Sequence, residues 1–385
     1  MGLATGPGHS DPVITFSGVG KRFPDGTVAV DGLDLKVEAG SFTVFVGPSG
    51  CGKTTSMRMI NRMVAPTAGT VSVDGRDVAS VDAVELRRGI GYVIQSAGLL
   101  PHRTVVDNVA TVPVLRGESR RAARRRALEV LDRVGLDPAL AGRYPAQLSG
   151  GQQQRVGVAR ALAADPPILL MDEPFSAVDP VVRADLQAEM QRLQSELHKT
   201  VVFVTHDIDE AVRLGDRLAV FGPHGRLQQY DSPQTVLTSP ATDFVADFVG
   251  RDRGYRGLSF RSADGLPLHE ITRIHESAIT ATDLTGGRWA LIVTDGGHPR
   301  GWIDAAGVAA VRSGVAVPEA SAAGGSLFTV GTDLRQALDA AISSPSGIGV
   351  AVDADGVVVG GVDAGEVLAR LDEQRRAEDD IRNGW

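Results

Sequence analysis

The sequence Gly47-Pro48-Ser49-Gly50-Cys51-Gly52-Lys53-Thr54 lies between an apolar stretch, 41–46, and a stretch that predicts a helix, 54–63. A glycine-rich turn between a strand and a helix can point several backbone N–H groups at one phosphate, at the positive end of the helix. The spacing G-x-x-x-x-G-K-[ST] also supplies a lysine for phosphate and a hydroxyl for Mg²⁺. The stretch therefore predicts an α/β nucleotide-binding fold in which Lys53 reaches the β- and γ-phosphates and Thr54 ligates Mg²⁺.

Two further motifs follow this loop in order. The first is Leu148-Ser149-Gly150-Gly151-Gln152, and the second is the apolar run 168–171, which ends in Asp172 and Glu173. An apolar strand ending in two carboxylates is common, but its position after both other motifs gives it functional weight. We expect Asp172 to hold Mg²⁺ through water and Glu173 to polarise the attacking water as a general base.

This order of motifs resembles the ATP-binding subunits of ABC transporters, over residues 13–250. The resemblance implies a P-loop ATPase with an F1-like core sheet, an antiparallel β-subdomain and a helical subdomain between Gln95 and Ser149. It also implies ATP and Mg²⁺ as cofactors and a head-to-tail dimer with two shared sites. In that dimer, Ser149 and Gly151 of one copy complete the γ-phosphate site of the other copy.

The same resemblance assigns roles to single residues. Phe23 would stack on adenine, although tyrosine is more usual there, and Gln95 would touch Mg²⁺ or water and report to a membrane subunit. Asp179 ends the segment Ser176-Ala177-Val178-Asp179, in which the family more often has leucine at 178. His206, after the apolar run 201–205, would contact the γ-phosphate. The predicted catalytic residues are Glu173, His206 and Lys53, and the predicted metal ligands are Thr54, Gln95 and Asp172. The predicted nucleotide contacts are Phe23, Gly47, Pro48, Ser49, Gly50, Cys51, Gly52, Lys53, Thr54, Thr55, Gln95, Ser149, Gly150, Gly151, Gln152, Asp179 and His206.

Composition limits the other classes of function. A chain of 385 residues with 43% apolar content can form two domains, and its one cysteine excludes an intrachain disulfide. Residues 258–385 hold 10 arginines and 18 acidic residues, whereas basic and acidic residues balance at 29 each in residues 1–257. This balance argues against nucleic acid as a partner. The basic run 116–126 is interpreted as a solvated helix face, with contact to a membrane partner or lipid headgroups as the alternative.

The last third of the chain contains an internal repeat. Residues 268–308 align without a gap on residues 327–367, at an offset of 59, and each copy predicts a helix, a strand, a glycine turn, a second strand and another helix. The predicted organisation is a disordered tail at 1–12, the ATPase domain at 13–250, a linker at 251–265, the repeat domain at 266–370 and a charged tail at 371–385. The repeat domain resembles a tandem CBS pair, and a small α/β scaffold that supports the dimer remains the alternative.

Several segments resemble the ATPase subunits of importers for glycine betaine, carnitine and choline. They are 23–30, 59–63 and 91–102, and that family also carries a C-terminal CBS pair. The resemblance implies an ATP hydrolase that powers uptake of quaternary amines and a regulatory role for the repeat domain. It also implies three partners: a second copy, an integral-membrane permease and, indirectly, an extracytoplasmic solute-binding protein. The chain itself has no signal peptide or apolar run of 18 residues, so we expect a cytoplasmic protein bound at the inner face of the plasma membrane. An importer for polar amino acids or another compatible solute is the alternative function.

Overall fold

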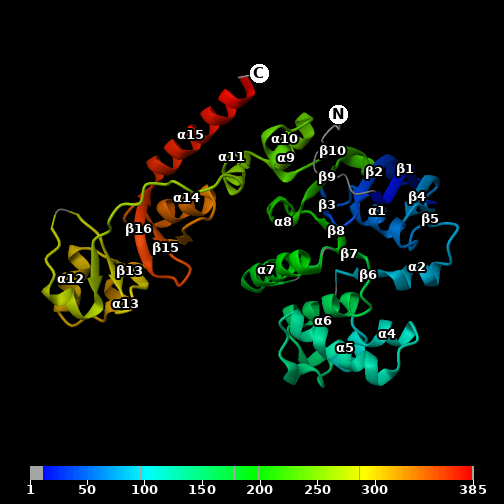
Figure 1. Cartoon of the computed structure of the whole chain (residues 1–385), viewed down its shortest axis with the longest axis horizontal. Helices are drawn as coiled ribbons and strands as arrows, with labels where there is room; N and C mark the ends of the chain where they lie inside the picture. Colours follow the sequence, from blue (N-terminus) through cyan, green and yellow to red (C-terminus); the bar gives the residue numbers. More distant parts are fainter. Residues whose placement is uncertain (1–11, 96–97, 177, 198, 286, 384–385) are drawn as a thin grey trace, which may run out of the picture. The chain divides into compact units, whose positions relative to one another are not determined.

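The computed structural model describes residues 12–95, 98–176, 178–197, 199–285 and 287–383. The chain forms two compact units, Met1–Arg251 and Asp252–Trp385 (Figure 1). Most of the predicted N-terminal tail lies outside the described residues, as do Ser96, Ala97 and Ala177 of the predicted motifs. Among the described residues, no helix is both long enough and apolar enough to cross a membrane.

A six-stranded sheet forms the centre of the first unit. Its central strands are buried along their whole length, which is typical of parallel strands covered on both faces. All strands of the sheet run parallel except the antiparallel edge strand β10. The strand order is β10 (Leu227–Asp231), β9 (Arg217–Phe221), β3 (Phe42–Val46), β8 (Thr200–Thr205), β7 (Ile168–Asp172) and β6 (Ile90–Val93).

Helices connect these strands and continue beyond the last one. They are α1 (Lys53–Ile60), α2 (Ala83–Gly89), α7 (Pro180–Leu197), α8 (Ile208–Leu214), α9 (Pro233–Thr238) and α10 (Asp243–Val249), with a short 3-10 turn, η3 (Pro223–Gly225). Because β3, β7 and β8 run parallel, their carboxyl ends lie at one edge of the sheet, where the predicted site residues follow them.

A second, antiparallel sheet belongs to the same unit and shares its core. Its strands, in order, are β2 (Val28–Glu38), β1 (Pro12–Arg22), β4 (Ala68–Val73) and β5 (Arg76–Asp77). Phe16 of β1 packs edge-on against Phe45 of β3, with ring centroids 6.3 Å apart. The apolar cluster therefore continues from one sheet into the other.

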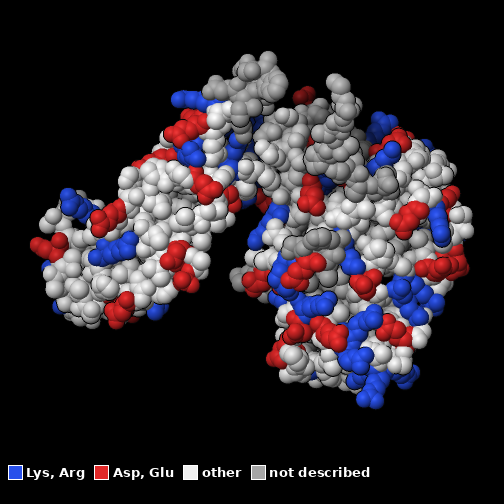
Figure 2. Space-filling view, in the orientation of Figure 1, with Lys and Arg blue, Asp and Glu red and all other residues white. Residues whose placement is uncertain are grey.

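A helical subdomain lies between β6 and β7. It consists of α3 (Val105–Val109), α4 (Thr111–Leu115), α5 (Arg120–Arg133), η1 (Pro138–Leu140), η2 (Pro145–Gln147) and α6 (Gly150–Leu162). On α5, Ala123, Ala127 and Leu131 are buried, whereas the arginines face solvent and gather at the end of the unit formed by α4 and α5 (Figure 2). Arg124 and Arg126 pair with Asp107 and Glu118 at 2.7 and 3.1 Å. The arginines of α5 thus lie on its exposed side, as predicted for the basic run, whereas Arg116 ends α4 and donates to the Ala164 carbonyl oxygen at 2.6 Å.

The second unit contains two three-stranded sheets with the same topology. In each, the first strand pairs parallel with the second and the second pairs antiparallel with the third. The first has β11 (Arg273–His275), β12 (Ala290–Val293) and β13 (Pro299–Ile303), with η5 (Glu276–Ala281), α12 (Ala305–Arg312) and α13 (Val317–Ala320). The second has β14 (Leu327–Thr329), β15 (Ile348–Val352) and β16 (Val358–Asp363), with α14 (Leu334–Ser343) and α15 (Ala364–Asn383).

The gapless alignment of the repeat is wrong at its first strand. Arg273 pairs with Leu291, whereas Leu327 pairs with Val350, so the paired residues of the first two strands lie five residues further apart in the sequence of the second copy. The second copy forms a ten-residue helix between these strands, whereas the first forms only a 3-10 segment, which at the offset of 59 falls within α14. The β-branched residues of Glu276–Ala281 are also poorer helix formers than the Ala and Leu residues of α14.

The predicted linker and C-terminal tail both carry regular structure. The linker segment contains α11 (Arg253–Gly257) and η4 (Leu258–Phe260), and Leu258 is buried in the core of the second unit. The segment was predicted as a linker because polar residues and glycines surround this short helical turn and obscure its apolar residues. The tail belongs to α15, which buries Leu371 in the same core. Residues 384–385 lie outside the described part of the chain.

Candidate functional site

The phosphate loop follows β3 and leads into α1. Gly47 and Gly52 have φ angles of 152° and 104°, which side chains rarely tolerate. A Cβ on Gly47 would lie 2.3 Å from the Phe221 carbonyl oxygen, and a Cβ on Gly52 would lie 2.2 Å from the carbonyl oxygen of Ala29. Only glycine fits these two positions, because backbone from neighbouring segments holds the loop on both sides.

Lys53 is buried at the first turn of α1, with 4% of its surface exposed. Its Nζ donates to the carbonyl oxygens of Gly47 and Pro48 at 2.7 and 2.8 Å. The ammonium group is thus enclosed by the loop, where an anion such as a phosphate would be its natural counter-charge. Cys51 is also buried, and burial raises the pKa of its thiol, which agrees with a packing role for this side chain.

Asp172 ends β7 directly beside this lysine loop. Its Oδ1 accepts a hydrogen bond from the Thr54 hydroxyl at 2.7 Å. Its Oδ2 lies 3.2 Å from Nη2 of Arg58 and 3.4 Å from the Tyr92 hydroxyl. Mg²⁺ prefers oxygen ligands and usually takes one or two protein ligands plus phosphate and water. The Thr54 hydroxyl and the Asp172 carboxylate therefore fit Mg²⁺ next to a nucleotide phosphate.

Glu173 turns away from the strand that carries it. Its φ of 45° is left-handed, an uncommon conformation for a residue with a side chain, and its backbone N–H donates to the Val204 carbonyl at 3.0 Å. The Glu173 carboxylate lies 3.3 Å from Nδ1 of His206, at the end of β8, and accepts a hydrogen bond from Gln95 Nε2 at 3.5 Å. The structure thus brings together three residues from the ends of three strands.

Ser149 begins α6 and is exposed. It forms a capping box with Gln152: Ser149 Oγ accepts from the Gln152 N–H at 3.3 Å, and Gln152 Oε1 accepts from the Ser149 N–H at 2.9 Å. Gly150 and Gly151 form the first turn of this 13-residue helix, whose N-terminus favours an anion. Ser149 belongs to the helical subdomain, whereas Lys53 starts a helix beside the core sheet (Figure 1).

Two further predicted contacts, outside the phosphate loop, lie at the surface. Phe23 is half-buried in a turn closed by its own N–H, which donates to the Thr27 carbonyl at 2.9 Å, and the Lys21 ammonium lies 5.2 Å from the centre of its ring. Asp179 is exposed just before α7. Both positions are accessible to a ligand.

Sequence reasoning missed Arg58 and Tyr92. Arg58 lies four residues after Thr54 on α1, so helical spacing alone could have placed it on the same face. Tyr92 reaches Asp172 because β6 pairs with β7 in the sheet, a pairing with no local signal in the sequence. Burial raises the pKa of the Tyr92 phenol, so the hydroxyl keeps its proton and donates a hydrogen bond to the Asp172 carboxylate.

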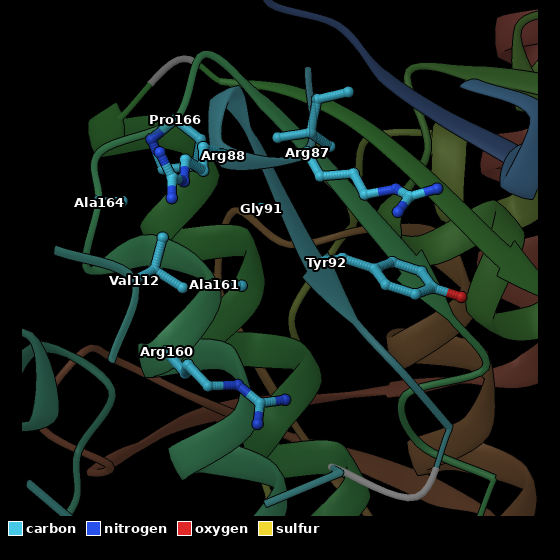
Figure 3. A pocket seen from close by; sticks show the side chains of 10 residues that line it. Arg87, Arg88, Gly91, Tyr92, Val112, Arg160, Ala161, Ala164 and Pro166 are labelled. Atoms are coloured by element: carbon cyan, nitrogen blue, oxygen red, sulfur yellow. The ribbon is translucent and has the colours of Figure 1, made fainter. Parts of the chain in front are cut away.

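A pocket lies between α2 and β6 on one side and α4 and α6 on the other (Figure 3). Arg160 lines it and donates from Nη1 to the Gly98 carbonyl at 2.6 Å, close in sequence to Gln95. Burial lowers the pKa of the Arg160 guanidinium. The full lining is Arg87, Arg88, Ile90, Gly91, Tyr92, Val112, Arg160, Ala161, Ala164 and Pro166.

Comparisons with known proteins agree with this geometry. The family model described as ABC transporter matches residues 30–176. The choline transport ATP-binding protein OpuBA of Bacillus subtilis is 49% identical over 241 residues, which cover 63% of each chain. The glycine betaine uptake system ATP-binding protein YehX of Escherichia coli is 52% identical over 251 residues, or 65% of this chain and 81% of YehX.

Solved structures show the same fold. The dimeric ATP-binding cassette MJ0796 bound to ADP and Pi superposes with a TM-score of 0.53 and 35% identity, over 57% of this chain and 98% of the cassette. The first unit therefore has an ABC-type ATPase fold, as the sequence predicted. The CBS-like nature of the second unit stays a prediction.

Proposed function

The chain belongs to the ABC transporter ATP-binding proteins, and from this premise we propose that it hydrolyses ATP to power the import of quaternary-amine osmoprotectants. One observation carries the ATPase proposal. The ends of β3, β7 and β8 bring a buried lysine, a hydroxyl–carboxylate pair and a Glu173–His206 pair to one edge of the sheet. The relatives named for choline and glycine betaine transport support the choice of solute.

In this proposal the loop binds the phosphates and the strand ends prepare the water. Mg²⁺, when bound, supplies positive charge that offsets the charge developing on the phosphoryl oxygens. Lys53 exchanges its carbonyl contacts for phosphate oxygens, while Thr54 and Asp172 hold the metal. Glu173 accepts a hydrogen bond from the attacking water and orients it, and His206 holds a γ-phosphate oxygen. Gln95 lies beside Glu173 and senses whether the γ-phosphate is present.

A second copy of the chain completes each site. Ser149 and Gly150 are exposed at the start of α6, so this end of the helix is available to a nucleotide held by another protomer, whereas the backbone of Gly151 is buried behind them. The dimer in which the MJ0796 cassette was solved supports this arrangement. We therefore propose a head-to-tail dimer that closes on ATP and opens after hydrolysis.

The proposed partner in the membrane is a permease, with a solute-binding protein acting through it outside the membrane. The pocket of Figure 3 suits the permease, because it adjoins the segment that leads from β6 through Gln95. A segment of the permease bound in this pocket would be displaced when Gln95 moves on ATP hydrolysis. We infer that the chain binds at the cytoplasmic face of the membrane through this permease.

We propose a regulatory role for the second unit. Its two sheets share strand order and pairing, which supports a duplicated, CBS-like module. Removing Asp252–Trp385, at the boundary between the units, should change how transport depends on ionic strength. If transport responds to salt in the same way without the second unit, this role is excluded.

The test of function is uptake of labelled glycine betaine, carnitine and choline after osmotic upshift. Cells would carry either the native chain or Glu173→Gln at matched expression, with other uptake routes deleted. Loss of uptake in the variant alone would support both the solute class and the role of Glu173. Equal uptake in both would contradict the assignment, and the same assay with polar amino acids would then test the alternative.

A further inference from the structure

Glu210 is a buried carboxylate directly behind His206, and the mechanism above does not use it. It lies on α8 with 7% of its surface exposed. Its Oε2 accepts a hydrogen bond from the Thr205 hydroxyl at 2.7 Å. Burial raises its pKa, partly offset by this hydrogen bond. Burying a carboxylate costs free energy unless it is paired, so the partners of Glu210 are expected to matter for the structure around it.

One set of contacts fixes the turn that carries His206. The Thr205 hydroxyl that donates to Glu210 also accepts a hydrogen bond from the backbone N–H of Asp207 at 3.0 Å. The residues on either side of His206 are therefore bonded to each other, and one of them is bonded to Glu210. Asp207 in turn caps α8, accepting from the N–H groups of Asp209 and Glu210 at 2.8 and 3.3 Å. The position of His206 therefore depends on the position of the Glu210 carboxylate.

A second set of contacts leads from Glu210 to α7. Nη1 of Arg183 lies 3.9 Å from Glu210 Oε1, and Gln187 Nε2 donates to the same oxygen at 3.4 Å. The other amino group of Arg183 donates to the Val178 carbonyl at 3.3 Å, and its backbone N–H donates to the Asp179 carbonyl at 2.8 Å. Arg183 thus holds the loop that presents Asp179.

These groups surround one small pocket. Glu173, Ser176, Arg183, Thr205, His206 and Glu210 all line it, together with Asp207. The proposed general base, the loop of Asp179 and the turn of His206 therefore face the same space. A displacement of the Asp179 loop can therefore be transmitted to His206 through direct contacts of Arg183 and Glu210.

We propose that Arg183 and Glu210 form a positioning bridge that couples the loop of Asp179 to the turn of His206. When the second protomer engages Asp179, the bridge sets His206 in place against the γ-phosphate. The inference rests on the proposed function, because it assumes that both residues serve the nucleotide site. Arg183 and Glu210 touch neither substrate nor metal and act only through these two elements.

The experiment compares full-length Glu210→Gln, Arg183→Met and the double variant with the native chain. Glu210→Gln keeps an acceptor for Thr205 but removes the charge that faces Arg183. Glu189→Gln is the matched control. Glu189 lies on α7, as Arg183 does, and its carboxylate pairs with the exposed Arg192 on the same helix. The measurements are kcat and KM for MgATP and the affinity for a fluorescent ATP analogue.

We expect each single variant to lower kcat by about tenfold or more while KM and analogue affinity stay within about twofold of the native values. The double variant should be no slower than the slower single variant, since both remove the same link. The control should keep the native kcat.

Two kinetic results would overturn the bridge: single variants as active as Glu189→Gln, or a double variant whose losses multiply. A loss of kcat that tracks a fall in melting temperature would also overturn it, since that result indicates a packing role alone. Failure of the proposed function looks different, because the native chain itself would then hydrolyse no ATP, or Glu173→Gln would hydrolyse it at the native rate.

Discussion

Replacing Gly52 with alanine should destabilise the first unit much more than the same replacement at Gly50. Both glycines belong to the phosphate loop and both have positive φ, 104° and 77°. They differ in their surroundings: a Cβ on Gly52 meets the Ala29 carbonyl oxygen at 2.2 Å, whereas a Cβ on Gly50 has no described atom within 4 Å. The pair therefore separates backbone strain from steric overlap.

The magnitudes follow from these two terms. Left-handed backbone strain costs about 1–2 kcal/mol at either position. Overlap with backbone, which cannot rotate away as a side chain does, adds about 1–3 kcal/mol at Gly52 alone. The lower entropy of an unfolded chain with alanine returns up to about 1 kcal/mol in both variants. We expect Gly52→Ala to be less stable than Gly50→Ala by about 1–3 kcal/mol.

Urea unfolding of the full-length variants measures this difference. All three tryptophans, Trp289, Trp302 and Trp385, lie in the second unit, so their fluorescence reports that unit, whereas far-ultraviolet circular dichroism reports both. The circular dichroism midpoint of Gly52→Ala should fall below that of Gly50→Ala by about 1 M urea. The fluorescence midpoints should agree. Equal circular dichroism midpoints for the two variants would refute the close approach of Gly52 to Ala29.

Three further predictions concern the metal site, a buried carboxylate and the second core. Asp172→Asn should bind ATP without Mg²⁺ as the native chain does but lose most of the Mg²⁺-dependent gain, measured by titrating Mg²⁺ against a fluorescent ATP analogue; an unchanged Mg²⁺ dependence would exclude Asp172 as a metal residue. The raised pKa of Glu210 means that the folded state binds this proton more tightly than the unfolded state, so its contribution to stability is lost as the pH rises from 4.5 through the raised pKa. The unfolding free energy of Glu210→Gln should therefore rise relative to that of the native chain as the pH increases across that range. A difference between the two chains that stays constant with pH would contradict this. Trp302 is 1% exposed, and Trp302→Ala should cost the second unit about 3–5 kcal/mol in urea unfolding followed by circular dichroism, whereas a cost below about 1 kcal/mol would contradict its place in the core.

The parts of the site that the sequence predicted have local signals. The spacing of Lys53 and Thr54 in one loop, and the apolar run before Asp172 and Glu173, need only the order of neighbouring residues. Parallel strands then bring these separate segments to one edge of the sheet, so the motifs meet without further information. The prediction of an ABC-type ATPase fold followed from such motifs, and the comparisons confirm it, together with the predicted similarity to ATP-binding proteins named for choline transport and glycine betaine uptake.

The features that the sequence did not predict depend on contacts between distant segments. Glu210 acquires its role from Arg183, which lies on another helix, and Tyr92 from strand pairing. The repeat was aligned from the similarity of its central strands, which the structure retains at β12 and β15. The shifted position of the first strand has no signal in this similarity, because the connection after that strand accepts insertions that leave the central strands in place.

The central claim is that ATP is held between two copies of this chain, and the most direct test is the mass of Glu173→Gln in solution. The account predicts that light scattering shows a 40.4 kDa monomer with MgADP and twice that mass with MgATP, because the variant binds ATP but does not hydrolyse it. Adding Ser149→Arg should restore the monomer while the first protomer still binds ATP. A Glu173→Gln chain that binds MgATP and stays monomeric would contradict the shared site.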